Sequence, residues 1–482
     1  MFDFRPVGYL TGILVSILGA SMILPLATDF LNGDRNWNAF AAAAVISLVC
    51  GGALMLSCAN SLKRGLNIQQ TFLLTTGVWL VLPLFGAVPF VLGAPHVGVT
   101  DAVFEAMSGM TTTGSTVFSG LDDLPMGVNL WRGLLQWFGG IGIIVVAMAF
   151  LPTLKVGGMQ LFRSEAFDTF GKILPRAAEI AASISVIYVA ITVACFIGYS
   201  WAGMDRFDAI VHSLTTVSTG GFSSRDASLG HYSGSAEYVA SLFMVLASLP
   251  FVRYVQLIGG SAKPMFRDVQ ARGYLAFIAT VTLILIVWIW FHEMRELHHG
   301  IREALFNAIS IISGTGYSSV DYQTWGTLPT VLFFLIGLVG GCAGSTSCSI
   351  KVFRFQLLFA SIGSQIRRIH SPHGVFTPKY GGHPVGEDVI SSVMAFLVMF
   401  MLSLAVISIL LGMLGLDLIT SVSGAATALA NVGPGLGPVI GPSGNFASLP
   451  ASAKWILSFA MLAGRLELVS VYVLFTVAFW RR

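Results

Sequence analysis

Thr111-Thr112-Thr113-Gly114-Ser115 decides the fold of this chain, because the turn stands between a half-length apolar segment and a full-length one and recurs three times. Its counterparts are Ser218-Thr219-Gly220-Gly221-Phe222, Ser313-Gly314-Thr315-Gly316-Tyr317 and Asn431-Val432-Gly433-Pro434-Gly435. When Gly114, Gly220, Gly316 and Gly433 are taken as equivalent, the turns lie 106, 96 and 117 residues apart. Such a repeat fixes the architecture. It predicts four units of roughly a hundred residues, each with two membrane-spanning helices and one half-length helix.

The segment before each turn is too short to cross a bilayer, and these segments are 101–112, 205–218, 301–313 and 417–431. Each opens with an acidic residue or carries one in its first turn, as Glu303 does, which suits a helix N-terminus. We therefore predict re-entrant half-helices. Their turns would lie partway into the membrane, where irregular backbone is tolerated only if protein buries it or it lines water.

Four turns that meet on one axis would form a pore for a dehydrated cation. Glycine permits positive φ and lets a carbonyl approach the ion closely, and rings of carbonyl oxygens replace the hydration shell. The half-helices would also point the negative ends of their dipoles at the same centre. A single glycine after a helix is more often a C-cap, but four at near-regular spacing favour the pore. We expect Pro434 to make the fourth turn stiffer than the others.

Composition places the chain in a bilayer. Of its 482 residues, 55% are apolar and 10% are charged, so a water-soluble fold would lack the polar atoms to cover its surface. We predict an all-α integral membrane protein with ten spans, namely a retained opening hairpin (7–31 and 37–59) and four membrane-pore-membrane repeats in pseudo-fourfold arrangement. The expected boundaries are 1–64 for the N-terminal two-helix hairpin and 65–172, 173–270, 271–380 and 381–482 for the pore repeats.

The distribution of charge predicts the orientation. Basic residues cluster at 63–64, 155–176, 253–272, 351–379 and 481–482. If these face the cytoplasm, as the positive-inside rule favours, both termini are inside and 18 of the 26 Lys and Arg, Arg5 included, lie on the inner side. The net charge of +3 is too small to indicate nucleic-acid binding. Five cysteines have no metal-ligand spacing and are predicted to be packing residues: Cys50, Cys58, Cys195, Cys342 and Cys348.

The sequence contains no catalytic constellation, so we predict that the protein is not an enzyme. His212 is expected to pack or to support a turn, and His370, His373 and His383 lie in a basic loop without a zinc signature. Several acids near the predicted mouth could raise the local cation concentration, or could be helix caps and solvated loop residues. They are Glu105, Asp122, Asp123, Asp205, Asp208, Asp226 and Asp321.

At these residues the sequence resembles the Trk-type bacterial potassium-uptake proteins of the Trk/Ktr/HKT superfamily, in particular the TrkH/TrkI subunit. The resemblance covers essentially the whole chain and includes Trp137-Phe138-Gly139-Gly140-Ile141-Gly142 and Ala463-Gly464-Arg465-Leu466-Glu467. It implies channel-like K+ uptake across the inner membrane, because glycine at the filter position of all four repeats is associated with K+ in that family. The expected ion-binding residues are Thr112, Thr113, Gly114, Thr219, Gly220, Gly221, Thr315, Gly316, Tyr317, Asn431, Val432 and Gly433.

The resemblance also implies two barriers below the filter. Residues 340–348 interrupt the second long helix of the third unit, as an intramembrane gating loop does in the family, and their glycines and serines have poor helix propensity. Close helix packing is the other interpretation of these small residues. Cys348 and Ser349 depart from the glycines expected there. The predicted gate residues are Gly340, Gly341, Gly344, Ser345, Thr346, Ser347, Lys351 and Arg465.

Arg465 is expected near the middle of a last span at 451–480, where a charge faces water or a partner by default. The family resemblance implies a positive barrier in the cavity under the filter. The alternative, a structural pair with Glu467, is disfavoured because residues two apart on a helix point to different sides. Lys351 would either seat the loop or snorkel to the membrane edge.

The resemblance further implies a homodimer with two separate pores, surrounded by lipid. It implies a cytoplasmic nucleotide-binding ring of RCK type that contacts the basic inner loops. The alternative function is a secondary transporter coupled to Na+ or H+. Four like-oriented repeats argue against it, because many such carriers use two inverted halves.

Overall fold

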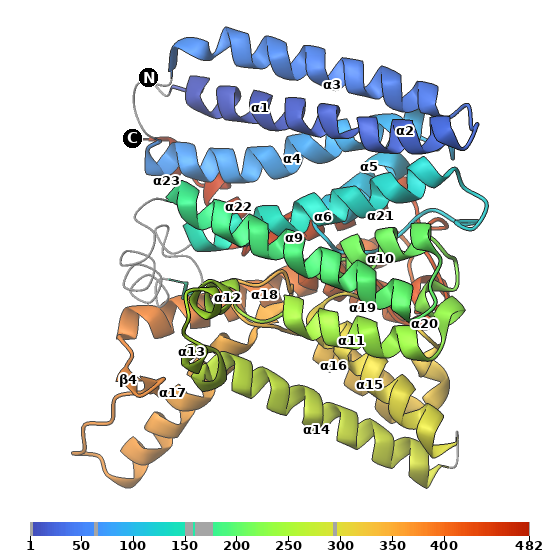
Figure 1. Cartoon of the computed structure of the whole chain (residues 1–482). Helices are drawn as coiled ribbons and strands as arrows, with labels where there is room; N and C mark the ends of the chain where they lie inside the picture. The colour runs from blue at the N-terminus through green and yellow to red at the C-terminus, as the bar shows by residue number, and fades with distance from the viewer. Residues whose placement is uncertain (1–2, 62–65, 150–157, 160–176, 293–295, 482) are drawn as a thin grey trace.

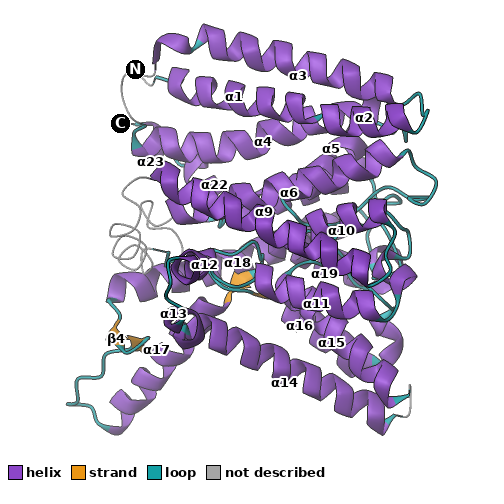
Figure 2. Ribbon diagram, in the orientation of Figure 1, coloured by secondary structure: helices purple, strands orange, loops and turns teal. Residues whose placement is uncertain are grey.

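The computed structural model describes residues 3–61, 66–149, 158–159, 177–292 and 296–481 (Figure 1). Helices dominate, and most of the long ones run between two ends of the molecule (Figures 1 and 2). The described strands form two short pairs, of which β1 (Val339–Gly340) and β2 (Ile350–Lys351) are parallel, and β3 (Lys379–Tyr380) and β4 (His383–Pro384) are antiparallel. The predicted all-α membrane fold is confirmed. The basic residues expected at 63–64 and 155–176, and Arg482, lie outside the described residues.

The opening hairpin packs through small residues. Its helices are α1 (Arg5–Ser21), α2 (Ile23–Leu31) and α3 (Trp37–Ser57), followed by η1 (Ala59–Ser61). A Cβ on Gly12 would lie 2.7 Å from the carbonyl oxygen of Gly51, and one on Gly51 would lie 2.8 Å from the carbonyl oxygen of Gly12. Glycine therefore permits the close van der Waals contact that holds helices together in lipid, where the hydrophobic effect does not drive them together.

Four units follow the hairpin. The first contains α4 (Ile68–Leu92), α5 (Val99–Met110) and α6 (Met126–Ala149). The second contains α9 (Ala177–Trp201), α10 (Arg206–Val217), η2 (Ser228–Tyr232), α11 (Ser235–Ala247), α12 (Phe251–Ile258) and α13 (Lys263–Arg267). The third contains α14 (Val269–Phe291), α15 (Leu297–Ser313), η3 (Tyr322–Trp325), α16 (Thr327–Gly337), β1, β2 and α17 (Val352–His370). After the β3–β4 hairpin, the fourth contains α18 (Glu387–Met413), α19 (Leu418–Ala430), α20 (Gly437–Ile440), α21 (Ala451–Arg465), α22 (Val469–Tyr472), η4 (Val473–Phe475) and α23 (Val477–Trp480).

Nine of the ten expected spans have a counterpart by length and composition. Within the described residues, seven helices are long and apolar enough to cross a membrane, with α1 and α2 counted as one, and two bent helix pairs could each supply another span. The tenth corresponds to α16 and α17. These helices are separated by β1, a loop and β2, so the interruption predicted for the third unit is present.

Two predicted spans are not continuous helices. α11 and α12 meet at 88°, and Pro250 explains the break because proline cannot donate the hydrogen bond that a continuing helix requires. α21 meets α22 and η4 at 108°, where Glu467 (φ 64°) and Leu468 (φ 49°) adopt left-handed conformations. The span predicted over 451–480 is therefore bent after α21 and is not one continuous helix. Arg465 is the last residue of α21, at the bend.

The four half-helices α5, α10, α15 and α19 match the predicted segments and lie inside the protein. Every residue of α5 from Ala102 to Met110 is buried. Asp417 caps α19, since its carboxylate accepts a hydrogen bond from the Thr420 amide at 3.1 Å. α15 begins at Leu297, so Glu303 lies in its second turn and not in the first, as the sequence suggested.

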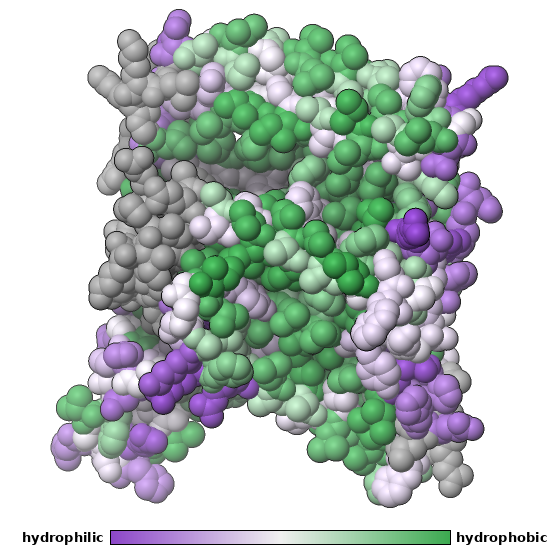
Figure 3. All heavy atoms as spheres, in the orientation of Figure 1, coloured by the Kyte–Doolittle hydropathy of each residue, from purple (hydrophilic) through white to green (hydrophobic). Residues whose placement is uncertain are grey.

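The two ends of the molecule differ. Figure 1 places both termini, α13 and α17 at one end, and the labels of the four half-helices in the opposite half. Figure 3 shows hydrophobic side chains across the middle of this face and hydrophilic ones gathered toward its ends. The half-helices therefore enter the molecule from the end opposite the termini.

Candidate functional site

Each half-helix ends in a turn of closely related backbone conformation. At or just after the helix end, φ is positive at Thr112 (53°), Thr219 (52°), Gly314 (81°) and Asn431 (53°). Two residues later it is positive again at Gly114 (85°), Gly221 (79°) and Gly316 (81°). Threonine is β-branched and rarely adopts left-handed φ, so the surrounding structure must hold the two threonines in a strained conformation.

The backbone angles correct the predicted alignment of the second turn. Gly221, not Gly220, has the conformation of Gly114 and Gly316. Gly221 also lines one hollow together with Gly114, Gly316 and Gly433. The equivalence assigned to Gly220 is therefore wrong by one residue, because two adjacent glycines leave the register open in the sequence.

The four turns meet in a closed ring. A Cβ on Gly114 would collide with the carbonyl oxygen of Gly220 in the second turn, and one on Gly221 with a carbonyl of the third turn. A Cβ on Gly316 would lie 2.7 Å from the nitrogen of Gly433 in the fourth turn, and one on Gly433 would lie 3.2 Å from the carbonyl carbon of Gly114. The contacts thus run from the first turn through the second, third and fourth and back to the first. Glycine allows this close backbone approach.

Side-chain hydrogen bonds join the fourth turn to the first and hold the third turn to the end of its own half-helix. The Asn431 Nδ2 atom donates to Thr113 Oγ1 at 3.0 Å, which joins the fourth turn to the first. The Ser115 hydroxyl donates to the Gly433 carbonyl at 2.8 Å across the same junction. Thr315 Oγ1 lies 2.7 Å from a hydroxyl of α15. These threonine hydroxyls have protein partners, and a carbonyl that accepts one hydrogen bond keeps a second lone pair.

The second turn is bracketed by Gln136 of α6. Its Nε2 donates to the Gly220 carbonyl at 2.6 Å, and its Oε1 accepts from the Phe222 amide at 3.0 Å. The side chain is fully buried, so neither bond competes with water. One glutamine therefore fixes the backbone on both sides of Gly221.

A buried ion pair stands behind the first and second turns. Arg132 Nε lies 2.8 Å from Glu105 Oε1, with the two side chains 1% and 0% exposed. Glu105 also accepts from the Val117 amide at 2.9 Å, and Arg132 Nη1 donates to the Ser223 carbonyl at 2.7 Å. The pair links the two chain segments that leave these turns. No local sequence pattern joins these two residues, which lie 27 positions apart.

The third turn rests on the second half-helix. The Tyr317 hydroxyl lies 2.5 Å from Thr215 Oγ1, and its ring lies 5.9 Å, centre to centre, from the His212 ring. His212 is buried and bonded through Nδ1 to the Asp208 carbonyl (2.8 Å) and through Nε2 to Ser223 Oγ (3.0 Å), as expected for a supporting residue. The Tyr317 side chain therefore joins the third turn to α10 by a hydrogen bond and a ring contact.

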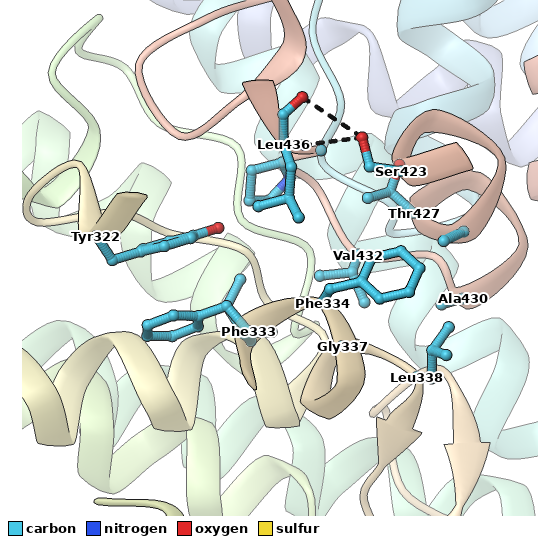
Figure 4. A pocket seen from close by; sticks show the side chains of 14 residues that line it. Tyr322, Phe333, Phe334, Gly337, Leu338, Ser423, Thr427, Ala430, Val432 and Leu436 are labelled. Atoms are coloured by element: carbon cyan, nitrogen blue, oxygen red, sulfur yellow. Dashed lines mark hydrogen bonds between the residues drawn. The ribbon is translucent and has the colours of Figure 1, made fainter. Parts of the chain in front are cut away.

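The fourth turn is the exception in the ring. Gly433 has no left-handed φ, and Pro434 follows it. An apolar pocket lies behind this turn, between α16 and α19 (Figure 4). Val432 lines the pocket together with Phe333 and Phe334, and beyond it the Ser423 hydroxyl accepts from the Leu436 amide at 3.0 Å.

Three of the acidic residues near the predicted mouth form ion pairs or hydrogen bonds with neighbouring residues. Arg225 Nη2 lies 2.8 Å from Asp208, and Arg225 Nη1 lies 3.1 Å from Asp122. Burial alone would raise the pKa of Asp122, but hydrogen bonds from the Asp226 amide and from Arg225 outweigh it and hold that pKa below its usual value. Asp226 accepts from the Leu121 amide at 3.1 Å. These carboxylates hold the loops that surround the ring.

The loop between β1 and β2 lies against the ring where the half-helices end, and it touches all four units. Ser347 Oγ donates to the carbonyl of Ser313, the last residue of α15, at 2.6 Å. The Ser349 amide donates to a carbonyl at the end of α19 at 2.9 Å, and Thr346 Oγ1 donates to a carbonyl at the end of α11 at 3.0 Å. Cys348 Sγ lies 3.5 Å from Thr112 Oγ1 in the first turn.

The remaining predicted gate residues hold the loop together. Gly340 belongs to β1 and Lys351 to β2, and the Gly341 amide donates to Ser347 Oγ at 2.8 Å. Lys351 Nζ donates to the Ser347 carbonyl. Gly344, Ser345 and Ser347 line an inner cavity together with Lys351 and Arg465.

Arg465 closes this cavity from the end of α21. The side chain is 4% exposed, and its Nη1 donates to the Thr346 carbonyl at 3.2 Å and to Cys348 Sγ at 2.7 Å. Glu467 pairs with Arg354 at 2.5 Å rather than with Arg465. Cys348 was predicted to be a packing residue, but its sulfur is also the acceptor for a buried cation.

A family model described as "Cation transport protein", TrkH, matches residues 36–481. The Trk system potassium uptake protein TrkI of Halomonas elongata is 41% identical over 481 residues, which cover 99% of this chain and 97% of that one. The Trk system potassium uptake protein TrkH of Escherichia coli is 36% identical over 99% of both chains. The crystal structure of the potassium transporter TrkH from Vibrio parahaemolyticus superposes with a TM-score of 0.90 over the whole of both chains, at 32% identity.

Proposed function

The chain belongs to the TrkH family of cation transport proteins, and on that premise we propose that it takes up K+ across the bacterial inner membrane through the ring of four turns. The observation that carries this proposal is the closed sequence of backbone contacts from Gly114 through Gly221, Gly316 and Gly433 back to Gly114. A ring of carbonyl oxygens at the ends of four half-helix dipoles suits a dehydrated monovalent cation. Glycine at all four positions supports a preference for K+ over Na+, in keeping with relatives named as potassium uptake proteins.

Two barriers would control the flow on the inner side. The loop at 340–349 lies across the inner face of the ring and is held by hydrogen bonds to each unit. Arg465 adds a positive charge in the cavity below. A buried guanidinium repels a cation more strongly than it would in water, because the surrounding dielectric constant is low. K+ would pass when the loop and the arginine move aside.

We place both termini in the cytoplasm, at the end that also carries α13 and α17 (Figure 1). The basic residues Lys263 and Arg267 of α13 and Arg367 and Arg368 of α17 support this orientation through the positive-inside rule. The same basic end would contact a cytoplasmic nucleotide-binding ring of RCK type. The functional assembly would be a homodimer in which each chain has its own pore.

Reconstitution tests this function. The purified full chain and its Arg465→Ala variant are placed in liposomes, and Rb+ and Na+ entry are followed under a membrane potential alone. Each charge gains about 2.3 kcal/mol per 100 mV, so we expect Rb+ entry with no Na+ or proton gradient. We expect it to exceed Na+ entry and to be faster in the variant. Entry that requires a Na+ or H+ gradient would establish the coupled transporter instead.

A further inference from the structure

One sulfur atom joins the two inner barriers to the ring. Cys348 is 4% exposed, and its Sγ accepts a hydrogen bond from Arg465 Nη1 at 2.7 Å. On another side the same sulfur lies 3.5 Å from Thr112 Oγ1, whose residue holds the strained φ at the start of the first turn. Loop, arginine and ring therefore meet at Cys348.

Within the described part of the chain, Cys348 is the side chain that accepts a hydrogen bond from Arg465. Its Nη1 has one further acceptor, the Thr346 carbonyl at 3.2 Å. Its Nε and Nη2 atoms have no hydrogen-bond partner among the residues that the structure describes. A buried guanidinium with so few acceptors is costly, so the Thr346 carbonyl and the Cys348 sulfur of the loop together determine where the charge lies.

We propose that Cys348 is the positioning residue that latches Arg465 to the intramembrane loop, so that the two barriers open and close as one unit. This inference rests on the gating function proposed above and adds the residue that couples its two parts. When the loop leaves the inner face of the ring, the sulfur leaves with it, and the guanidinium loses its side-chain acceptor at the same moment. When the loop returns to the ring, Cys348 Sγ again accepts the hydrogen bond from Arg465 Nη1 and the guanidinium returns to its position.

The latch can be tested by a double-mutant cycle in liposomes of the full chain, with Rb+ flux measured in the absence of any partner. Cys348→Ala removes the thiol acceptor and leaves the Thr346 carbonyl, so we expect basal flux to rise several-fold, as the loss of one weak hydrogen bond allows. Cys348→Ser keeps an acceptor at the same position and should stay close to the native flux. Arg465→Ala should raise flux by itself, and the double variant Cys348→Ala/Arg465→Ala should show no further increase, because the latch acts through the arginine.

The controls separate the latch from packing and from the gate itself. Cys195→Ala removes an equally buried thiol on α9 and should leave flux unchanged. Independent, additive increases in the cycle, or a native flux in Cys348→Ala, would overturn the latch while the arginine barrier stood. No increase in Arg465→Ala would instead overturn the barrier on which the latch rests. Size-exclusion profiles show whether each variant is folded.

Discussion

The second and fourth turns lie on opposite sides of the ring, yet they are held in different ways. The second turn has two glycines, a left-handed φ at Gly221 and the buried Gln136 bonded on both sides of it. The fourth turn has Gly433 without a left-handed φ, a proline after it and an apolar pocket behind it (Figure 4). A ring that must match an ion's size thus has one side fixed by hydrogen bonds and one side backed by apolar packing.

The same asymmetry extends to the ion pairs on α5. Glu105 pairs with fully buried Arg132, which also donates to the Ser223 carbonyl after the second turn. Asp101, one helical turn earlier, pairs at 2.6 Å with Lys454 of α21 in the fourth unit, and the two side chains are 33% and 6% exposed. Water therefore weakens the link on the side of the fourth turn. We infer that substitutions on the side of the second turn cost more than matched substitutions on the side of the fourth.

The largest expected effect comes from the ion pairs. Glu105→Gln leaves Arg132 buried without its counter-charge, and we expect it to destabilise the fold by about 3 kcal/mol or more. Asp101→Asn breaks a pair that water reaches on the Asp101 side, and buried Lys454 keeps the Ala447 carbonyl as an acceptor at 2.8 Å, so we expect a smaller loss of stability than in Glu105→Gln. Thermal unfolding of the two purified variants in detergent measures the difference. Equal decreases in Tm would show that the ion pairs on the sides of the second and fourth turns contribute equally to the stability of the fold.

The glycines of the ring give the next test. In Gly221→Ala a Cβ would meet the Thr315 carbonyl oxygen, and the left-handed φ of 79° adds about 1–2 kcal/mol of strain for an alanine. We expect Rb+ flux to fall close to background. Gly433→Ala places its Cβ 3.2 Å from Gly114 without that strain, so a smaller loss of flux is expected. A greater loss of Rb+ flux in Gly433→Ala than in Gly221→Ala would contradict the inference that substitutions on the side of the second turn cost more.

Gln136→Ala should loosen the second turn without blocking it. It removes two buried hydrogen bonds and leaves the Phe222 amide without this partner, at a cost of about 1–3 kcal/mol. We expect the ratio of Rb+ to Na+ flux to fall several-fold. The matched change beyond the fourth turn is Ser423→Ala, which removes the bond to the Leu436 amide. If it lowered the ratio as much as Gln136→Ala, hydrogen bonding would not distinguish the two sides.

Much of this fold was predictable because membrane helices obey strong local rules. Apolar runs of membrane length gave the spans, and the half-length segments gave α5, α10, α15 and α19 within four residues at each end. The break between α11 and α12 also had a signal, since Pro250 stands at the bend. The bend after α21 had none, because Leu468 takes a left-handed φ that its residue type does not favour.

The ring was predictable as four turns, but not in its details. Adjacent glycines left the register of the second turn open, and only the backbone angles select Gly221 over Gly220. Long-range partners were equally hidden. No local pattern predicts that Gln136 brackets a turn 84 residues away, or that Cys348 accepts a hydrogen bond from Arg465. Such contacts depend on tertiary packing.

The smallest expected effect concerns the pocket behind the fourth turn. Gly337 ends α16 and lines this pocket, and a Cβ there would meet Ile311 Cγ2 at 3.5 Å, an ordinary contact. Gly337→Ala should therefore stabilise the fold by roughly 0.5–1 kcal/mol, because alanine loses less conformational freedom than glycine on folding.

We expect the ratio of Rb+ to Na+ flux to stay unchanged in Gly337→Ala, since the added methyl group touches α15 and not the ring. Unfolding in detergent and paired flux measurements on the same preparation test both parts. A changed ratio would mean that the packing behind Val432 sets the width of the ring as strongly as Gln136 does on the opposite side. The selectivity of the pore would then depend equally on its apolar side and on its hydrogen-bonded side.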